Sequence, residues 1–158
     1  MSDLRRWLDR VVDLNHAYAA CLDARQLAAW PDFFTADCLY RIQSTEDHEA
    51  GRAHAAIYCD GRDMLVDRAT TVEKVLFHQP RRQRRHVTGV RIVSEADGRI
   101  RACANFMLTE AFVDAPLAIT MAGRYLDTIV EVDGQLKFFE RLCVYDNHHI
   151  DRSIIYPV

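Results

Sequence analysis

The sequence predicts an α+β fold in which N-terminal helices are packed in a curved antiparallel sheet. Apolar residues recur at helical spacing near the N-terminus, alternating β-type segments fill the second half, and Asp-Gly dipeptides join two pairs of these segments. Helices first and long hairpins afterwards indicate a small cone that its own helices close. The 158 residues are enough to bury one continuous core, so residues 1–158 are expected to form a single domain.

Three helices are expected in the first half of the chain. The first has one apolar stripe with three- and four-residue spacing, formed by Leu4, Trp7, Leu8, Val11, Leu14, Tyr18 and Leu22. The second covers residues 24–30 and is expected to end at Trp30, because Pro31 disfavours the α conformation of the residue before it. The third is expected over residues 62–76.

Four strands are expected in the second half, over residues 86–94, 99–113, 117–132 and 135–146. The dipeptides Asp97-Gly98 and Asp133-Gly134 are suited to the positive φ angles of type I′ hairpin turns. These signals predict an antiparallel meander that wraps around the helices.

Composition excludes several classes of function. A formal net charge of -3 gives no basic face for a phosphate backbone, so nucleic-acid binding is not expected. No apolar run reaches the ~20 residues that span a bilayer, and the N-terminus reads as an amphipathic helix start without a signal peptide, which predicts a cytoplasmic protein without membrane contact. The five cysteines are widely spaced, contain no CxxC pair, and are expected to be reduced and packed.

Metal and nucleotide sites are not expected either. A Rieske cluster needs two Cys and two His in short paired spacings, and a mononuclear iron site needs two His and a carboxylate that converge. The sequence has neither set, and His148 and His149 would point to opposite faces of a strand. The scattered glycines form no phosphate-binding loop.

One catalytic hypothesis is an acid/base pair in the cone, with Asp37 and His86 as the pair and Tyr40 or Tyr125 as hydrogen-bond donor. A carboxylate or imidazole shielded from water can have its pKa moved toward neutrality. Asp37 can equally cap the segment after the Phe-Phe-Thr turn, and His86 can stand at the polar start of a strand. The residues alone favour these structural roles.

Two further segments are interface candidates. Arg81, Arg82, Arg84 and Arg85 alternate along a strand, where they form either a solvated edge that blocks strand pairing or a clamp for carboxylates of another subunit. Candidate ion-pair partners for these arginines are Asp63, Asp67, Glu140 and acids of another chain. The tail with Ile154, Ile155 and Tyr156 is too apolar for water, and is expected to pack on a neighbour or across its own sheet.

Several motifs share an order and spacing that are specific only when they are taken together. They are the helix end with Gln26, Leu27, Trp30, Pro31, Phe33, Phe34, Thr35, Asp37, Cys38, Tyr40 and Arg41; residues 47–51; Asp63, Met64, Leu65, Asp67 and Arg68; residues 84–86; Ala122, Gly123, Arg124, Tyr125 and Asp127; and Glu140, Arg141, Val144, Tyr145, Asp146 and Asn147. With them the chain resembles, nearly end to end, the small subunit of aromatic-ring-hydroxylating oxygenases. The likeness is to the branch that acts on aromatic acids such as terephthalate, salicylate or anthranilate.

The resemblance implies a nuclear-transport-factor-like cone with a non-catalytic, structural role. It implies that the large (alpha) subunit carries the Rieske [2Fe-2S] cluster and the mononuclear Fe(II), that three large and three small chains assemble with contacts among the small subunits, and that a separate reductase, directly or through a ferredoxin, supplies electrons from NADH. A free-standing isomerase or dehydratase that uses Asp37, Tyr40 and His86, and a small-ligand binding protein, remain as alternatives.

Overall fold

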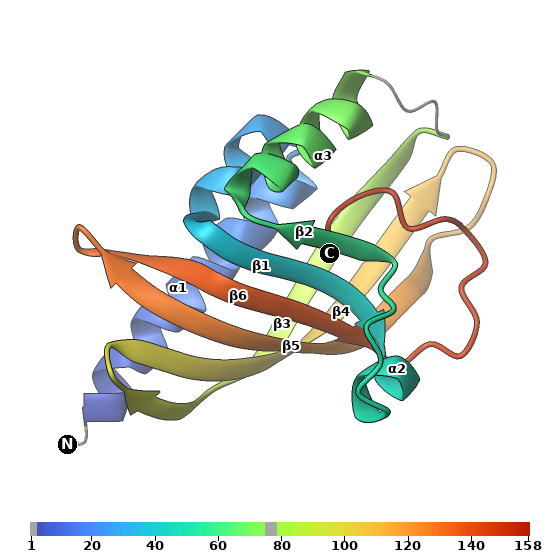
Figure 1. Ribbon diagram of the computed structural model, residues 1–158. Helices are drawn as coiled ribbons and strands as arrows, with labels where there is room; N and C mark the ends of the chain where they lie inside the picture. Colours follow the sequence, from blue (N-terminus) through green and yellow to red (C-terminus); the bar gives the residue numbers. More distant parts are fainter. Residues whose placement is uncertain (1–2, 75–78) are drawn as a thin grey trace.

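The computed structural model describes residues 3–74 and 79–158 and consists of helices packed against one curved, six-stranded sheet (Figure 1). In chain order the elements are α1 (Asp3–Asp23), the 3₁₀ helix η1 (Leu27–Phe33), β1 (Phe34–Ser44), α2 (Thr45–Glu49), β2 (Ile57–Asp60), α3 (Arg62–Lys74), β3 (Arg81–Ala96), β4 (Arg99–Phe112), β5 (Ala118–Val132) and β6 (Gln135–Tyr145). The predicted α+β class is confirmed.

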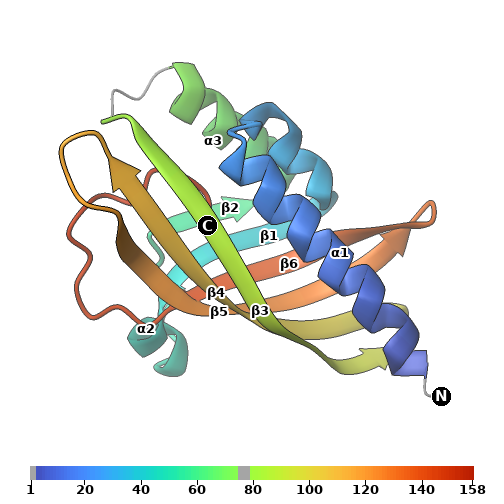
Figure 2. The same ribbon diagram turned by 180° about the vertical axis from the view of Figure 1, so that it is seen from behind.

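The sheet has the strand order β2-β1-β6-β5-β4-β3, so β2 and β3 are its edges. Strands β3 to β6 form the predicted antiparallel meander. The sheet as a whole is mixed, because β1 pairs with β6 in parallel while β2 pairs with β1 antiparallel. Neither β1 nor β2 was predicted. Helix α1 crosses the sheet diagonally and packs along β3 (Figure 2).

Both Asp-Gly hairpins form as predicted. Asp97 and Gly98 have φ angles of 53° and 71°, and Asp133 and Gly134 have 50° and 78°. Positive φ at both central positions is the requirement of a type I′ turn, whose twist matches that of the flanking strands.

The second helix differs from its prediction. It begins later, at Leu27, and continues through Pro31 to Phe33 as a 3₁₀ helix. Pro31 has no N–H, and this short 3₁₀ helix tolerates the missing donor. Its carbonyl oxygen still accepts a hydrogen bond from the Phe34 N–H. The third helix is present as α3, and the last residues of its predicted span, 75–76, lie outside the described residues.

The core lies between α1, η1, α3 and the concave face of the sheet. The predicted apolar stripe of α1 faces the core, where it contributes Trp7, Val11, Tyr18 and Leu22. Cys21, Cys38, Cys59 and Cys143 are buried free thiols and Cys103 is half-buried, as predicted. Burial raises the pKa of the Cys143 thiol to about 12, which keeps it neutral at physiological pH.

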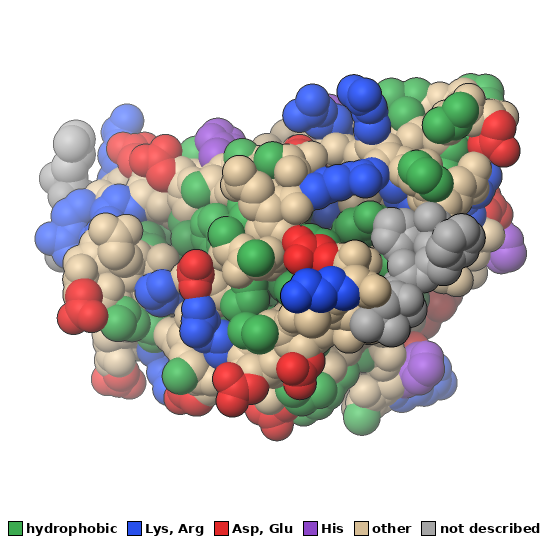
Figure 3. All heavy atoms as spheres, turned by 90° about the horizontal axis from the view of Figure 1, so that it is seen from above, with side chains coloured by type: hydrophobic (Ala, Val, Ile, Leu, Met, Phe, Trp, Pro, Cys, Tyr) green, Lys and Arg blue, Asp and Glu red, His purple; other side chains and the backbone are tan. Residues whose placement is uncertain are grey.

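The surface of the molecule carries interspersed charges. The face seen in Figure 3 mixes Lys and Arg with Asp and Glu and has no broad region of a single sign. In the described parts of the chain, no helix is long and apolar enough to cross a membrane.

Replacing Trp30 with Ala is expected to lower the free energy of unfolding by about 3–5 kcal/mol, the usual cost of truncating a buried aromatic residue. The Trp30 side chain is fully buried, and its ring centroid lies 5.1 Å from Tyr40 and 5.9 Å from Phe34. Urea unfolding monitored by circular dichroism measures the change. Tyr58→Ala is the control, because Tyr58 is 46% exposed; equal losses for the two variants would contradict the core role of Trp30.

Candidate functional site

The interior of the cone contains a buried ion pair. Arg141 on β6 and Asp127 on β5 are opposite each other in the strand register, and their side chains are 0% and 1% exposed. Arg141 donates from Nε to Asp127 Oδ1 at 2.9 Å and from Nη2 to Asp127 Oδ2 at 3.0 Å. Asn15 on α1 accepts a further hydrogen bond from Nη2. The pair therefore connects two strands with the helix that covers them.

Three aromatic rings surround the same guanidinium group. Arg141 Cζ lies 3.8 Å from the ring centroid of Tyr125, 4.0 Å from that of Phe138 and 4.3 Å from that of Tyr18. Ring faces attract a cation, and the attraction is strongest where water is excluded. Burial raises the pKa of Asp127, and the adjacent Arg141 opposes that rise. Burial alone would lower the pKa of Arg141, but Asp127 and the two tyrosines raise it.

Two tyrosine hydroxyls in the interior bind the end of the tail. Tyr18 donates to the main-chain oxygen of Val158 at 2.8 Å, and Tyr40 donates to the same oxygen at 3.2 Å. The Val158 N–H donates to Tyr40 Oη at 2.8 Å. Burial raises the pKa of Tyr18 to about 12 and that of Tyr40 well above its usual value, so both remain neutral donors near pH 7.

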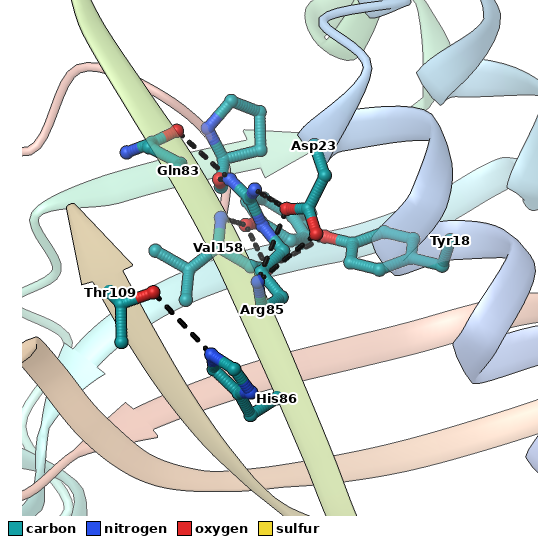
Figure 4. Close-up of polar contacts among 9 residues, drawn as sticks. Tyr18, Asp23, Gln83, Arg85, His86, Thr109 and Val158 are labelled. Carbon is teal, nitrogen blue, oxygen red and sulfur yellow. Dashed lines mark hydrogen bonds and ion pairs between the residues drawn. The ribbon is translucent and has the colours of Figure 1, made fainter. Parts of the chain in front are cut away.

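The structure does not bring the proposed acid/base residues together. Asp37 on β1 and His86 on β3 are exposed, whereas Tyr40 and Tyr125 are fully buried. His86 is directed toward Thr109, with 3.4 Å between His86 Nε2 and Thr109 Oγ1 (Figure 4). Nothing shields Asp37 or His86 from water, which is the condition on which the acid/base hypothesis depended.

The arginine run is divided between the two faces of β3. Arg81 and Arg85 are buried, and Arg82 and Arg84 are exposed. Arg85 forms an ion pair with Asp23 at the end of α1, at 2.7 Å, and Asp23 also accepts from the Arg85 main-chain N–H (Figure 4).

Arg81 forms an ion pair with Glu110 on the adjacent strand β4, at 3.1 Å. Asp23 and Glu110 were not among the acids considered from the sequence. The acids expected from the sequence lie on α3 and β6, whereas the observed acids lie on α1 and on β4, the strand next to β3.

The tail packs across its own sheet, which is one of the two outcomes expected for it. Ile154 and Ile155 are half-buried, and Tyr156 and Val158 are 6% and 1% exposed. Arg68 on α3 donates to the main-chain oxygen of Ile155 at 2.7 Å.

The histidine pair lies on the surface. His148 and His149 have side chains that are 88% and 83% exposed, and each contacts one acid, Glu46 and Asp151 respectively. Across residues 3–74 and 79–158, no three His, Cys, Asp or Glu side chains are grouped so that they could hold a metal ion.

The cone with its ion pair was the part of the site that sequence reasoning missed. Asp127 and Arg141 were recognised as motif residues but were given no role. Each follows the inward alternation of its strand, Asp127 with Tyr125 and Arg141 with Cys143. Charged residues at inward positions of two adjacent strands are the signal that could have revealed the pair.

These observations define a class: a small α+β cone whose interior holds a buried ion pair, aromatic rings and the chain's own tail. Residues 17–152 match the family described as the ring hydroxylating beta subunit. The chain belongs to this family.

The chain is similar to known proteins over nearly its whole length. Subunit beta 1 of the terminal oxygenase component of terephthalate 1,2-dioxygenase from Comamonas sp. is 29% identical, over 94% of this chain and 97% of that protein. The small subunit of anthranilate 1,2-dioxygenase from Burkholderia cepacia is 26% identical, over 99% and 96%. A crystal structure of a beta subunit assigned to an aromatic-ring-hydroxylating dioxygenase from Novosphingobium aromaticivorans DSM 12444 has a TM-score of 0.89, with 28% identity and 98% coverage of both chains. The chain is thus a non-catalytic small subunit of an oxidoreductase.

Replacing Arg141 with Leu is expected to cost about 3–5 kcal/mol of unfolding free energy, because it leaves the buried Asp127 without its partner. The double variant Arg141→Leu/Asp127→Leu should recover part of that loss. Urea unfolding of these two variants and of the single variant Asp127→Leu measures the coupling. Arg101→Leu, at an exposed position of β4, is the control and should change stability by less than about 0.5 kcal/mol. Additive losses for Arg141 and Asp127 would show that the pair is not coupled.

Proposed function

We propose that this chain is the structural small subunit of a Rieske non-haem iron oxygenase that hydroxylates an aromatic carboxylic acid. The observation that carries the proposal is the family match over residues 17–152, joined to relatives of matching length whose names give terephthalate and anthranilate as substrates. The described residues offer no group of ligands for a cluster or an iron ion. In this proposal the large (alpha) subunit holds both the [2Fe-2S] cluster and the Fe(II), and supplies the chemistry.

The proposed assembly contains three large and three small chains, with contacts among the small subunits as well as with the large ones. A reductase, directly or through a ferredoxin, brings electrons from NADH, which places the complex in the cytoplasm. The small subunit contributes a rigid body whose stability comes from the interior described above.

The arginine run provides an interface candidate within this proposal. Arg82 and Arg84 are exposed on the edge strand β3, and no acid within the described residues pairs with them. Two outward guanidinium groups at positions i and i+2 of one strand can bind carboxylates of another subunit. Arg81 and Arg85 already have acids within this chain, so they hold the fold while Arg82 and Arg84 remain for assembly.

Co-expression with a candidate large (alpha) subunit encoded in the same genome tests the proposed function. The expected result is one peak in size-exclusion chromatography that contains both chains, is brown, and carries iron. Purified alone, this chain should be folded and colourless. If the two chains elute separately and the large chain carries its iron without this one, the subunit proposal is wrong.

The double variant Arg82→Ala/Arg84→Ala is expected to weaken assembly about tenfold or more, as loss of charged interface contacts does. Its own unfolding free energy should change by less than about 0.5 kcal/mol, because both side chains are exposed. The fraction of this chain that co-elutes with the large chain, measured at several concentrations, reports the effect. Arg91→Ala/Arg101→Ala, on exposed positions of β3 and β4, is the matched control. Equal assembly by the two double variants would remove Arg82 and Arg84 from the interface.

A further inference from the structure

The tail after β6 reaches the interior of the cone without joining the sheet. It passes around the end of β4 and β5 and returns so that the end of the chain lies near β2 and β3 (Figures 1 and 2). Within the described part of the chain, no main-chain hydrogen bond joins residues 150–158 to a strand. A strand of the core would have a ladder of such bonds, so the tail is held in a different way.

Side chains of the body bind the main chain of the tail. Arg68 donates to the oxygen of Ile155, Arg85 to that of Pro157, and Tyr18 and Tyr40 to that of Val158. The Val158 N–H donates to Tyr40, and Pro157 has no N–H that needs a partner. This is the pattern of a bound peptide, whose main-chain groups are read by the side chains of its receptor (Figure 4).

The groups that bind the tail are held in place by contacts with the body. Asp23 fixes the guanidinium of Arg85 at 2.7 Å. The ring of Tyr18 packs edge to face on Phe138 at 5.6 Å, and that of Tyr40 packs on Trp30 at 5.1 Å. Residues of the body therefore help to position the walls of the site.

A cavity of about 390 Å³ lies between the tail and strands β4 and β5. Leu108, Met121 and Glu110 line it from the sheet, and Ile154, Tyr156 and Val158 line it from the tail. Tyr156 and Val158 of the tail are 6% and 1% exposed, and the tail also borders this cavity. It has space into which it can move without displacing a strand.

We propose that the cone interior is a peptide-binding site and that the segment Ile154–Val158 is its detachable ligand. The site takes an extended apolar segment with acceptor oxygens at two successive positions and a small branched side chain at the second. The side chains that bind this segment are Tyr18, Tyr40 and Arg85. The proposal does not depend on the identity of the assembled enzyme.

The test uses the full chain with a protease recognition sequence inserted between Asp151 and Arg152, both of which are exposed. The chain is folded, labelled on the tail and cleaved, and excess synthetic peptide of residues 150–158 is added. The expected result is exchange of the labelled tail for the peptide while the far-ultraviolet circular dichroism stays unchanged. Trp30 fluorescence should follow the exchange, since Trp30 packs on Tyr40.

Two comparisons make the result specific. A peptide with Val158→Asp should compete at least about tenfold more weakly, because it places a charge in an apolar site. Tyr40→Phe in the body should release the tail faster, because it removes a hydrogen bond to Val158. His86→Ala should not, because His86 is exposed and contacts Thr109 on β4. Equal competition by both peptides would overturn the proposed recognition.

Exchange only under conditions that also unfold the body, or no exchange in the presence of excess peptide, would show that the tail is an integral part of the core and would overturn the proposal. If the insertion at residue 151 prevents folding, the same sequence is inserted between His148 and His149, whose side chains are more than four-fifths exposed. Exchange without unfolding then supports the proposal, and its absence overturns the proposal.

Discussion

The buried ion pair between Arg141 and Asp127 is the interaction on which the arrangement of the cone depends. A guanidinium group with no exposed surface needs an acid and other acceptors within the protein, because an unpaired charge in the interior costs several kcal/mol. Asp127 supplies them from β5, Asn15 from α1, and Tyr18 adds a ring face from the same helix. The pair is satisfied only where the register of β5 and β6 and the position of α1 are both correct, so it couples the sheet to its covering helix.

The interior of the cone serves the stability of the chain. Inside the cone Arg141 and Asp127 bind each other, and Tyr18 and Tyr40 bind the tail. The exposed Asp37 and His86 lie outside this interior. Buried tyrosines whose pKa values are raised by burial hold hydrogen bonds and do not exchange protons near neutral pH. An interior organised in this way stabilises a body that other subunits can pack against.

Local signals in the sequence predicted most of the fold, and contacts between distant segments account for what was missed. The stripe of α1 and the two Asp-Gly turns each depend on a few neighbouring residues, so they could be read directly. Strand β1 directs Cys38, Tyr40 and Ile42 inward, but it directly follows η1, and α2 separates it from β2, so no hairpin signal marks it. Its parallel pairing with β6 joins residues about a hundred positions apart, which no hairpin signal can indicate.

The arginine run shows why a charge pattern can have two roles at once. Alternation on β3 directs Arg81 and Arg85 inward and Arg82 and Arg84 outward. The inward pair could be buried only because Glu110 on β4 and Asp23 on α1 arrive from elsewhere in the fold. Asp23 also takes the Arg85 main-chain N–H, which removes one donor from the free edge of the sheet. The edge is therefore partly closed by the chain itself, and the two arginines of the run that point away from the core remain exposed.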